Sequence, residues 1–147
     1  MFDTAIRHVL EPRKLVTAAP DASVLEASRL MAADTVGAVL VVEQGNLVGI
    51  FTERDAVYRV MAAGRDPGAT RLAEVMTPQP KTVELDETFG YALLLMHDHG
   101  FRHAPVVEEG RPVGMLSARH ALDPDLEEFA AEAERRRSIR RRARPGA

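Results

Sequence analysis

Hydrophobic residues recur along the first half of the chain with two different spacings. Within residues 24–31 the apolar positions lie three or four apart, which is typical of one face of a helix. Two short apolar runs follow, 38–43 and 47–51, and the glycine in the turn between them predicts a hairpin. An extended segment at 15–18 precedes the helix, and a second helix is expected after Thr52. The order is strand–helix–strand–strand–helix, which indicates an α/β fold.

The same pattern occurs again 65 residues later. At this shift residues 17–57 align with 82–122 without a gap, and 13 of the 41 positions are identical. The equivalent segments are an extended piece at 81–84, a helix over 89–96, strands at 104–108 and 113–116, and a second helix after Ser117. We call the two units copy one and copy two. A unit of roughly 60 residues buries little surface by itself, so the copies are expected to share a core around an internal pseudo-twofold axis.

The repeat divides the chain into five segments. They are a lead-in helix (1–12), a first unit (13–63), a connector marked by glycine and proline (64–80), a second unit (81–122) and an arginine-rich C-terminal helix or tail (123–147). Residues 5–12 resemble 71–78 at a shift of 66, so the lead-in belongs to the repeat. Pro78 and Pro80 predict an extended entry into copy two.

Helix starts are marked by capping residues. Asp21 and Asp86 are the expected N-caps of the first helix in each copy. Asp123 and Pro124, followed by acidic residues, predict a helix that runs to about Arg142, and the helix dipole favours arginines at that end.

Composition narrows the class of protein. The chain has 147 residues, 46% hydrophobic and 28% charged, as in soluble globular proteins. No apolar run is long enough to span a membrane, and the N-terminus lacks the features of a signal peptide, so we expect a cytoplasmic protein. The absence of cysteine excludes disulfides, thiolate metal sites and thiol catalysis. No nucleophile elbow, Ser-His-Asp order or Walker loop occurs, so we do not expect an enzyme.

Charge is distributed unevenly along the chain. The net charge is −3, but residues 1–134 carry 12 basic and 22 acidic residues, which gives −10, and the last thirteen residues carry +7. The arginine run, Arg135–Arg144, has three interpretations: a solvated tail, a contact with acidic protein surfaces, or non-specific binding to nucleic acid or anionic lipid. It contains no aromatic residue to stack on bases, which argues against sequence-specific recognition.

The segment Gly49–Asp55 has residues suited to a nucleotide. A helix that starts at Thr52 exposes backbone N–H groups, and these with the Thr52 hydroxyl suit a phosphate. Asp55 lies one turn along on the same face, where its carboxylate can accept hydrogen bonds from a ribose diol. The alternative is that Thr52 only caps the helix and that Asp55 is a solvated acid.

We predict no metal site at His97 and His99, because residues two apart do not share a helix face.

These features resemble a known family. The repeat length, the ending Gly-x-x-Thr/Ser-x-x-Asp and the segment Phe101–Val107 are similar to a tandem pair of CBS domains, called a Bateman module. The resemblance covers nearly all of residues 5–122, and Glu74–Pro78 is similar to the small stand-alone bacterial members. It implies two β-α-β-β-α units, a regulatory role, adenosine-type ligands bound between the domains, and pairing into disc-shaped dimers.

The resemblance also implies two composite sites that differ. In the first, the helix start of copy one faces strands of copy two, with the residues Thr52, Asp55, Thr82, Val83, Arg102, His103, Pro105 and Arg119. The weaker second site consists of Thr17, Ala18, Ala38, Ser117 and His120. In that site His120 replaces the aspartate, and Gly37–Leu40 replaces the segment Arg102–Pro105, so we expect one competent site.

The leading hypothesis is a homodimeric regulatory module. It would bind ATP, ADP, AMP or S-adenosylmethionine, with or without Mg²⁺, and would transmit a conformational change to a protein partner. The alternative is a dimeric scaffold, independent of any ligand, whose arginine-rich tail binds nucleic acid or an acidic partner.

Overall fold

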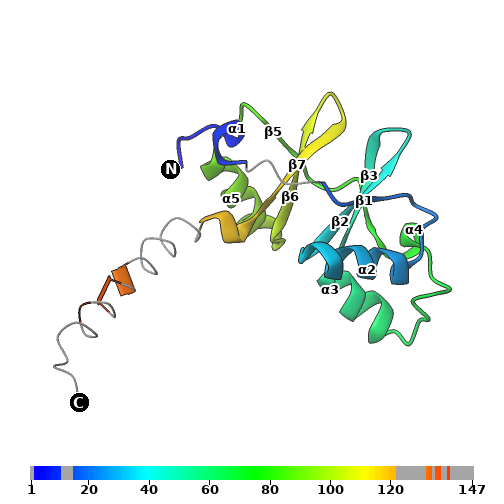
Figure 1. The fold of residues 1–147 in the computed structure, drawn as a ribbon. Coiled ribbons are helices and arrows are strands. Elements are labelled where there is room, and N and C mark those ends of the chain that lie inside the picture. Colours follow the sequence, from blue (N-terminus) through cyan, green and yellow to red (C-terminus); the bar gives the residue numbers. More distant parts are fainter. Residues whose placement is uncertain (1, 11–14, 122–131, 134, 137–138, 140–147) are drawn as a thin grey trace, which may run out of the picture.

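The computed structural model describes residues 2–10, 15–121, 132–133, 135–136 and 139 (Figure 1). In copy one and its connector the elements are β1 (Thr17–Ala18), α2 (Val24–Asp34), β2 (Ala38–Glu43), β3 (Asn46–Thr52), α3 (Glu53–Asp55), the π-helix η1 (Ala56–Met61), α4 (Leu72–Val75) and β4 (Thr77–Pro78). In copy two they are β5 (Val83–Glu84), α5 (Phe89–His99), β6 (His103–Glu108), β7 (Arg111–Ser117) and the 3₁₀-helix η2 (Ala118–Ala121). The lead-in forms α1 (Ile6–Val9). The predicted α/β fold of two related units is confirmed.

Each copy contains one small sheet. The strand order is β1-β2-β3-β4 in copy one and β5-β6-β7 in copy two. The first strand of each sheet is parallel to the second, with Ala18 opposite Val41 and Val83 opposite Val106, so the register is also preserved at a shift of 65. The two hairpins have tight turns in which both central residues have positive φ, and Gly45 and Gly110 have φ of 79° and 77°. Glycine adopts this conformation without strain, as predicted.

The capping residues differ from those predicted. Ser23, not Asp21, caps α2: its hydroxyl accepts a hydrogen bond from the Glu26 N–H at 3.1 Å. Thr88, not Asp86, caps α5 by accepting one from the Tyr91 N–H. Both hydroxyls stand two residues closer to the first helical turn than the aspartates do, which explains the error.

The connector departs from its prediction at one residue. Gln79 has a φ of +45°, so the predicted extended entry into copy two is wrong at this residue, whose N–H donates to the Val48 carbonyl.

The predicted C-terminal helix lies mostly outside the described residues. Residues 132–133, 135–136 and 139 are helical, and Glu132 pairs with Arg136 at 3.0 Å. Among the described residues, no helix is both long and apolar enough to cross a membrane.

The lead-in segments cross between the copies. Ile6 of α1 is fully buried in the core of copy two, with Phe89 and Leu116. Leu72 of α4, at the equivalent position, is fully buried in the core of copy one. Figure 1 shows α1 beside α5 and β5, although copy one follows α1 directly in sequence. The N-terminal segment therefore completes the more distant copy.

A smaller apolar cluster joins the two copies. Ala38, Leu40 and Ile50 of copy one are buried there, with Met115 of copy two packed against them. Near the hairpin turns, the Leu47 N–H donates to the Gly110 carbonyl at 3.2 Å. Each copy thus has its own core, and what they share is this third cluster.

Candidate functional site

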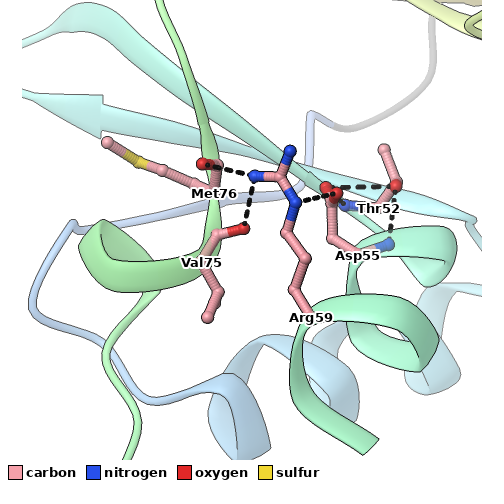
Figure 2. Close-up of polar contacts among 5 residues, drawn as sticks. All are labelled: Thr52, Asp55, Arg59, Val75 and Met76. Atoms are coloured by element: carbon pink, nitrogen blue, oxygen red, sulfur yellow. Dashed lines mark hydrogen bonds and ion pairs between the residues drawn. The ribbon is translucent and has the colours of Figure 1, made fainter. Parts of the chain in front are cut away.

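The start of α3 is closed by a reciprocal cap. Thr52 is the extended last residue of β3, and its Oγ1 accepts a hydrogen bond from the Asp55 N–H at 3.3 Å. Asp55 Oδ2 accepts hydrogen bonds from the Thr52 N–H at 3.0 Å and from the Thr52 hydroxyl at 3.2 Å (Figure 2). Asp55 is only 8% exposed. Thr52 does cap the helix, but Asp55 is a buried, oriented carboxylate and not a solvated one.

Arg59 completes the surroundings of this carboxylate. Its Nε lies 3.5 Å from Asp55 Oδ1, one helical turn further along. Its Nη1 donates to the carbonyl oxygens of Val75 and Met76, both at 3.2 Å. Figure 2 shows the guanidinium between Asp55 and the end of α4. The α3 start is thereby connected to the segment that leads into copy two.

Several helix-start N–H groups are already bonded within the protein. Those of Thr52 and Asp55 belong to the cap, and that of Glu53 donates to the Gly37 carbonyl at 3.0 Å. Copy two has the equivalent bond, from Ala118 to the Arg102 carbonyl at 2.9 Å. A phosphate at this helix start therefore depends more on cationic side chains than on backbone N–H groups.

Copy two approaches the α3 start through two contacts. A Cβ built on Gly37 would lie 3.2 Å from both His103 Nε2 and Glu53 Oε1. Because Gly37 has no side chain, the side chains of His103 and Glu53 can both pack against its backbone. Arg54 Nη1 donates to the Gly100 carbonyl at 3.3 Å. Arg54 thus meets segment 100–103, and Glu53 and His103 both lie against Gly37, whereas Asp55 faces Arg59 on its own copy.

The other residues predicted for the first site differ in exposure. Arg102 and Arg119 are exposed, and Thr82 and His103 are partly buried. Val83 and Pro105 are fully buried, and the Val83 side chain belongs to the core of copy two. A ligand could therefore reach Val83 or Pro105 only after local rearrangement.

The residues predicted for the second site lie in β1, in β2, at the end of β7 and in the 3₁₀ turn. Thr17 and Ala18 form β1, and Ala38 is fully buried in the cluster between the copies. The Ser117 hydroxyl accepts a hydrogen bond from the Arg119 N–H two residues on, at the start of a 3₁₀ turn. His120 lies in that turn, but its side chain is outside the described residues. Copy two therefore has no carboxylate equivalent to Asp55.

Four residues at the first site were given no role there by the sequence reasoning: Gly37, Glu53, Arg54 and Arg59. Two signals were available. Arg54 and Arg119 are identical at the 65-residue shift, and Arg59 follows Asp55 at the i,i+4 spacing of a helical ion pair.

A surface pocket of about 290 Å³ lies in copy two between the end of α5 and η2. Its lining includes the apolar Leu93, Met96 and Phe101 together with His97 and Arg102, and only Arg102 belongs to the predicted site. Among the described residues, no group of three or more His, Asp or Glu side chains could hold a metal ion.

Both copies match a known domain family. The family model of the CBS domain matches residues 6–62 and 72–126. The Bacillus subtilis CBS domain-containing protein YhcV is 36% identical over 104 residues, which cover 71% of this chain and 74% of that protein. The fission yeast Meiotically up-regulated gene 70 protein is 36% identical over 122 residues, but the match spans only 17% of its length.

A solved structure shares the fold. The CBS domain protein PAE2072 from Pyrobaculum aerophilum, complexed with AMP, superposes with a TM-score of 0.73 at 26% identity. The match covers 80% of this chain and 89% of that one.

Proposed function

This chain belongs to the CBS-domain family as a tandem pair, and we propose that it is a regulatory module that binds an adenine nucleotide beside the start of α3. Proteins of this family are generally regulatory rather than catalytic. The P. aerophilum neighbour that was solved with AMP supports this class of ligand. AMP is accordingly the first ligand to test.

The observation that carries the proposal is the buried, oriented carboxylate of Asp55. Its bonds with Thr52 occupy Oδ2 and orient the carboxylate, so Oδ1 is the oxygen left to accept hydrogen bonds from a ribose diol. Hydrogen bonds to a carboxylate are stronger than those between neutral groups. Asp55 therefore suits the ribose, which is the part that all adenosine ligands share.

Cationic side chains of both copies suit the phosphate. Arg54 reaches segment 100–103 of copy two, Arg102 and Arg119 are exposed, and His103 lies against Gly37 beside Glu53. Residues 1–134 carry a net charge of −10, which disfavours anions in general. Local positive charge is therefore needed to attract a phosphate to this position.

Calorimetric titration of AMP into the full chain tests the proposal. We expect Thr52→Ala and Asp55→Ala each to weaken binding by tenfold or more, because each removes a polar partner of the ligand. The matched controls are Ser117→Ala and His120→Ala, the equivalent positions of copy two, and both should bind AMP as the wild type does. Wild-type affinity in Asp55→Ala would contradict the site.

Stability must be separated from binding, since Thr52 and Asp55 also cap α3. Thr52→Ser retains a capping hydroxyl and should retain AMP binding, and circular dichroism of each variant reports the fold. Titrations with and without Mg²⁺, and with ATP and S-adenosylmethionine, distinguish the ligands within this class.

We also propose that the protein forms a homodimer. Large apolar side chains are exposed on η1 and α5, including Tyr58 at 66%, Met61 at 75% and Leu94 at 58%. Large exposed apolar side chains that gather on a surface mark interaction sites, and burial against a second copy would cover these. Light scattering of the purified chain measures the mass directly.

The charge asymmetry favours the scaffold as a second candidate. An acidic body with a +7 terminus suits a cationic tail that binds nucleic acid or an acidic protein. No heat from any nucleotide, together with salt-dependent nucleic-acid binding that deletion of residues 135–147 abolishes, would favour this function.

A further inference from the structure

Arg59 joins two parts of the molecule that are distant in sequence. Its guanidinium contacts the Asp55 carboxylate at 3.5 Å and the carbonyls of Val75 and Met76 at 3.2 Å (Figure 2). Val75 is the last residue of α4 and Met76 is its C-cap. Carbonyls at a helix end lack helical partners and carry partial negative charge, so a guanidinium is well suited to them. We call this set of contacts the Arg59 bridge.

The bridge ends where the connector enters copy two. After α4 the chain forms β4, which pairs with β3 through Thr77 opposite Ile50, and then continues into β5 of copy two. A change at the end of α4 is therefore a change in the covalent link between the copies.

A diol at the Asp55 carboxylate competes with Arg59 for one oxygen. A carboxylate has about four acceptor positions, and a vicinal diol donates two hydrogen bonds. Thr52 donates twice to Oδ2 and so occupies the positions on that oxygen. The diol must therefore bind at Oδ1, where Arg59 Nε lies 3.5 Å away in an ion pair that is longer than an ordinary hydrogen bond. A diol at Oδ1 takes the place of this guanidinium, which is the more weakly held partner.

Only copy one contains this arrangement. At the 65-residue shift, His120 stands in place of Asp55 and Pro124 in place of Arg59, so copy two lacks both side chains of the bridge. The bridge is thus specific to the site that contains Asp55.

We propose that Arg59 relays occupation of Asp55 to the α4–β4 segment: a ribose-bearing ligand draws Asp55 away from Arg59, and the guanidinium then releases the end of α4. This inference rests on the proposed function, because it assumes that Asp55 receives the ligand. The ligand shifts the α4 equilibrium only as far as it prefers the released state. By reciprocity, removing Arg59 favours ligand binding.

Hydrogen–deuterium exchange of the full chain, with AMP as the probe, tests the relay. In the wild type, saturating AMP should accelerate exchange in residues 72–80 at least threefold, including that of the Met76 N–H, which bonds to the Leu72 carbonyl at 2.7 Å. Arg59→Ala should show this faster exchange without ligand and no further change with AMP. It should also bind AMP several-fold more tightly than the wild type. Arg59→Met, which keeps the aliphatic stem, should behave in the same way if the alanine variant folds poorly.

Arg65→Ala is the matched control. Arg65 also contacts α4, through Glu74 at 2.8 Å, but it has no contact with Asp55. In Arg65→Ala, AMP should therefore still accelerate amide exchange in residues 72–80 as it does in the wild type. If Arg59→Ala binds AMP and responds in residues 72–80 as the wild type does, the relay is wrong while the proposed function stands. If the wild type binds no AMP, the proposed function fails and the relay fails with it.

Discussion

At the scale of single residues, acidic side chains fix the starts of several helices and turns. In each case a carboxylate accepts a hydrogen bond from the backbone N–H three residues earlier: Glu26 from Ser23, Asp55 from Thr52, Glu74 from Arg71, and Glu87 from Glu84. Such local bonds satisfy N–H groups that a helix start leaves unpaired. Asp55 differs from the others because it is buried and also contacts Arg59.

Glu74 makes the first residue-scale prediction. The backbone N–H of Arg71, and then the charge of Arg65, keep the pKa of the Glu74 carboxyl below its ordinary value. A carboxyl whose pKa is lower in the folded state stabilises that state above its unfolded pKa, and the contribution is lost as the pH falls through the folded value. Glu74→Gln should therefore melt below the wild type at neutral pH, and the difference should shrink below about pH 4.3.

Thermal melts between neutral and acidic pH measure this difference. Glu109→Gln, a change in an exposed hairpin turn, is the control for loss of a surface carboxylate. A difference in melting temperature that stays constant down to acidic pH would show that Glu74 acts through packing and not through its charge.

The sequence predicted part of this detail. The pairing of Thr52 with Asp55 on one face follows from helical spacing. That the two residues bond to each other could not be predicted, because a capping box and a ligand site use the same residue types at the same spacing. The contacts of Arg59 with Val75 and Met76 depend on how α4 packs, and no local pattern encodes that packing.

At the scale of elements, two glycines allow the lead-in segments to lie close to the sheets. A Cβ on Gly49 of β3 would lie 2.4 Å from Met76 Sδ, and one on Gly114 of β7 would lie 2.4 Å from a methyl carbon of Leu10. The glycines are equivalent at the shift of 65, and Leu10 and Met76 at the shift of 66. The same close approach therefore occurs in both copies.

Gly49→Ala tests this packing. We expect it to lower the free energy of unfolding by about 1–3 kcal/mol, because the end of the Met76 side chain must move from its place over β3. Adding Met76→Ala should relieve the clash, so the double variant should lose less stability than the sum of the two single variants. Urea unfolding measures all three, and strict additivity would contradict the contact.

The order of the elements and the helix start at Thr52 follow from the sequence, but the exact ends of the elements and the type of helix after each hairpin do not. The strand at 38–43 ends as predicted, and β3 extends one residue beyond the prediction at each end. Copy one continues as α3 and a π-helix, whereas copy two has a 3₁₀ turn. The two starts differ in their caps, since Asp55 bonds back to Thr52 and His120 offers no carboxylate there.

At the scale of the whole molecule, the crossing of the lead-ins decides how the copies depend on each other. Hydrophobic spacing shows which face of a short helix is apolar, but not which of two similar cores covers it. The sequence therefore identified residues 5–12 and 71–78 as equivalent without showing that α1 completes copy two. The Ile6 N–H donates to the Glu87 carbonyl and the Leu72 N–H to the Ala22 carbonyl, both at 2.9 Å. Each lead-in is thus bonded to the helix entry of the copy that it covers.

Ile6→Ala and Leu72→Ala form a matched pair that tests this crossing. Each removes a fully buried side chain at an equivalent position, so each should cost about 2–5 kcal/mol of unfolding free energy. Their local effects should be opposite. Ile6→Ala should accelerate amide exchange mainly in residues 83–117, which lie far along the chain, and Leu72→Ala mainly in residues 17–61. If Ile6→Ala instead loosened copy one, its neighbour in sequence, then α1 would not belong to the core of copy two, and the crossing of the lead-ins would be wrong.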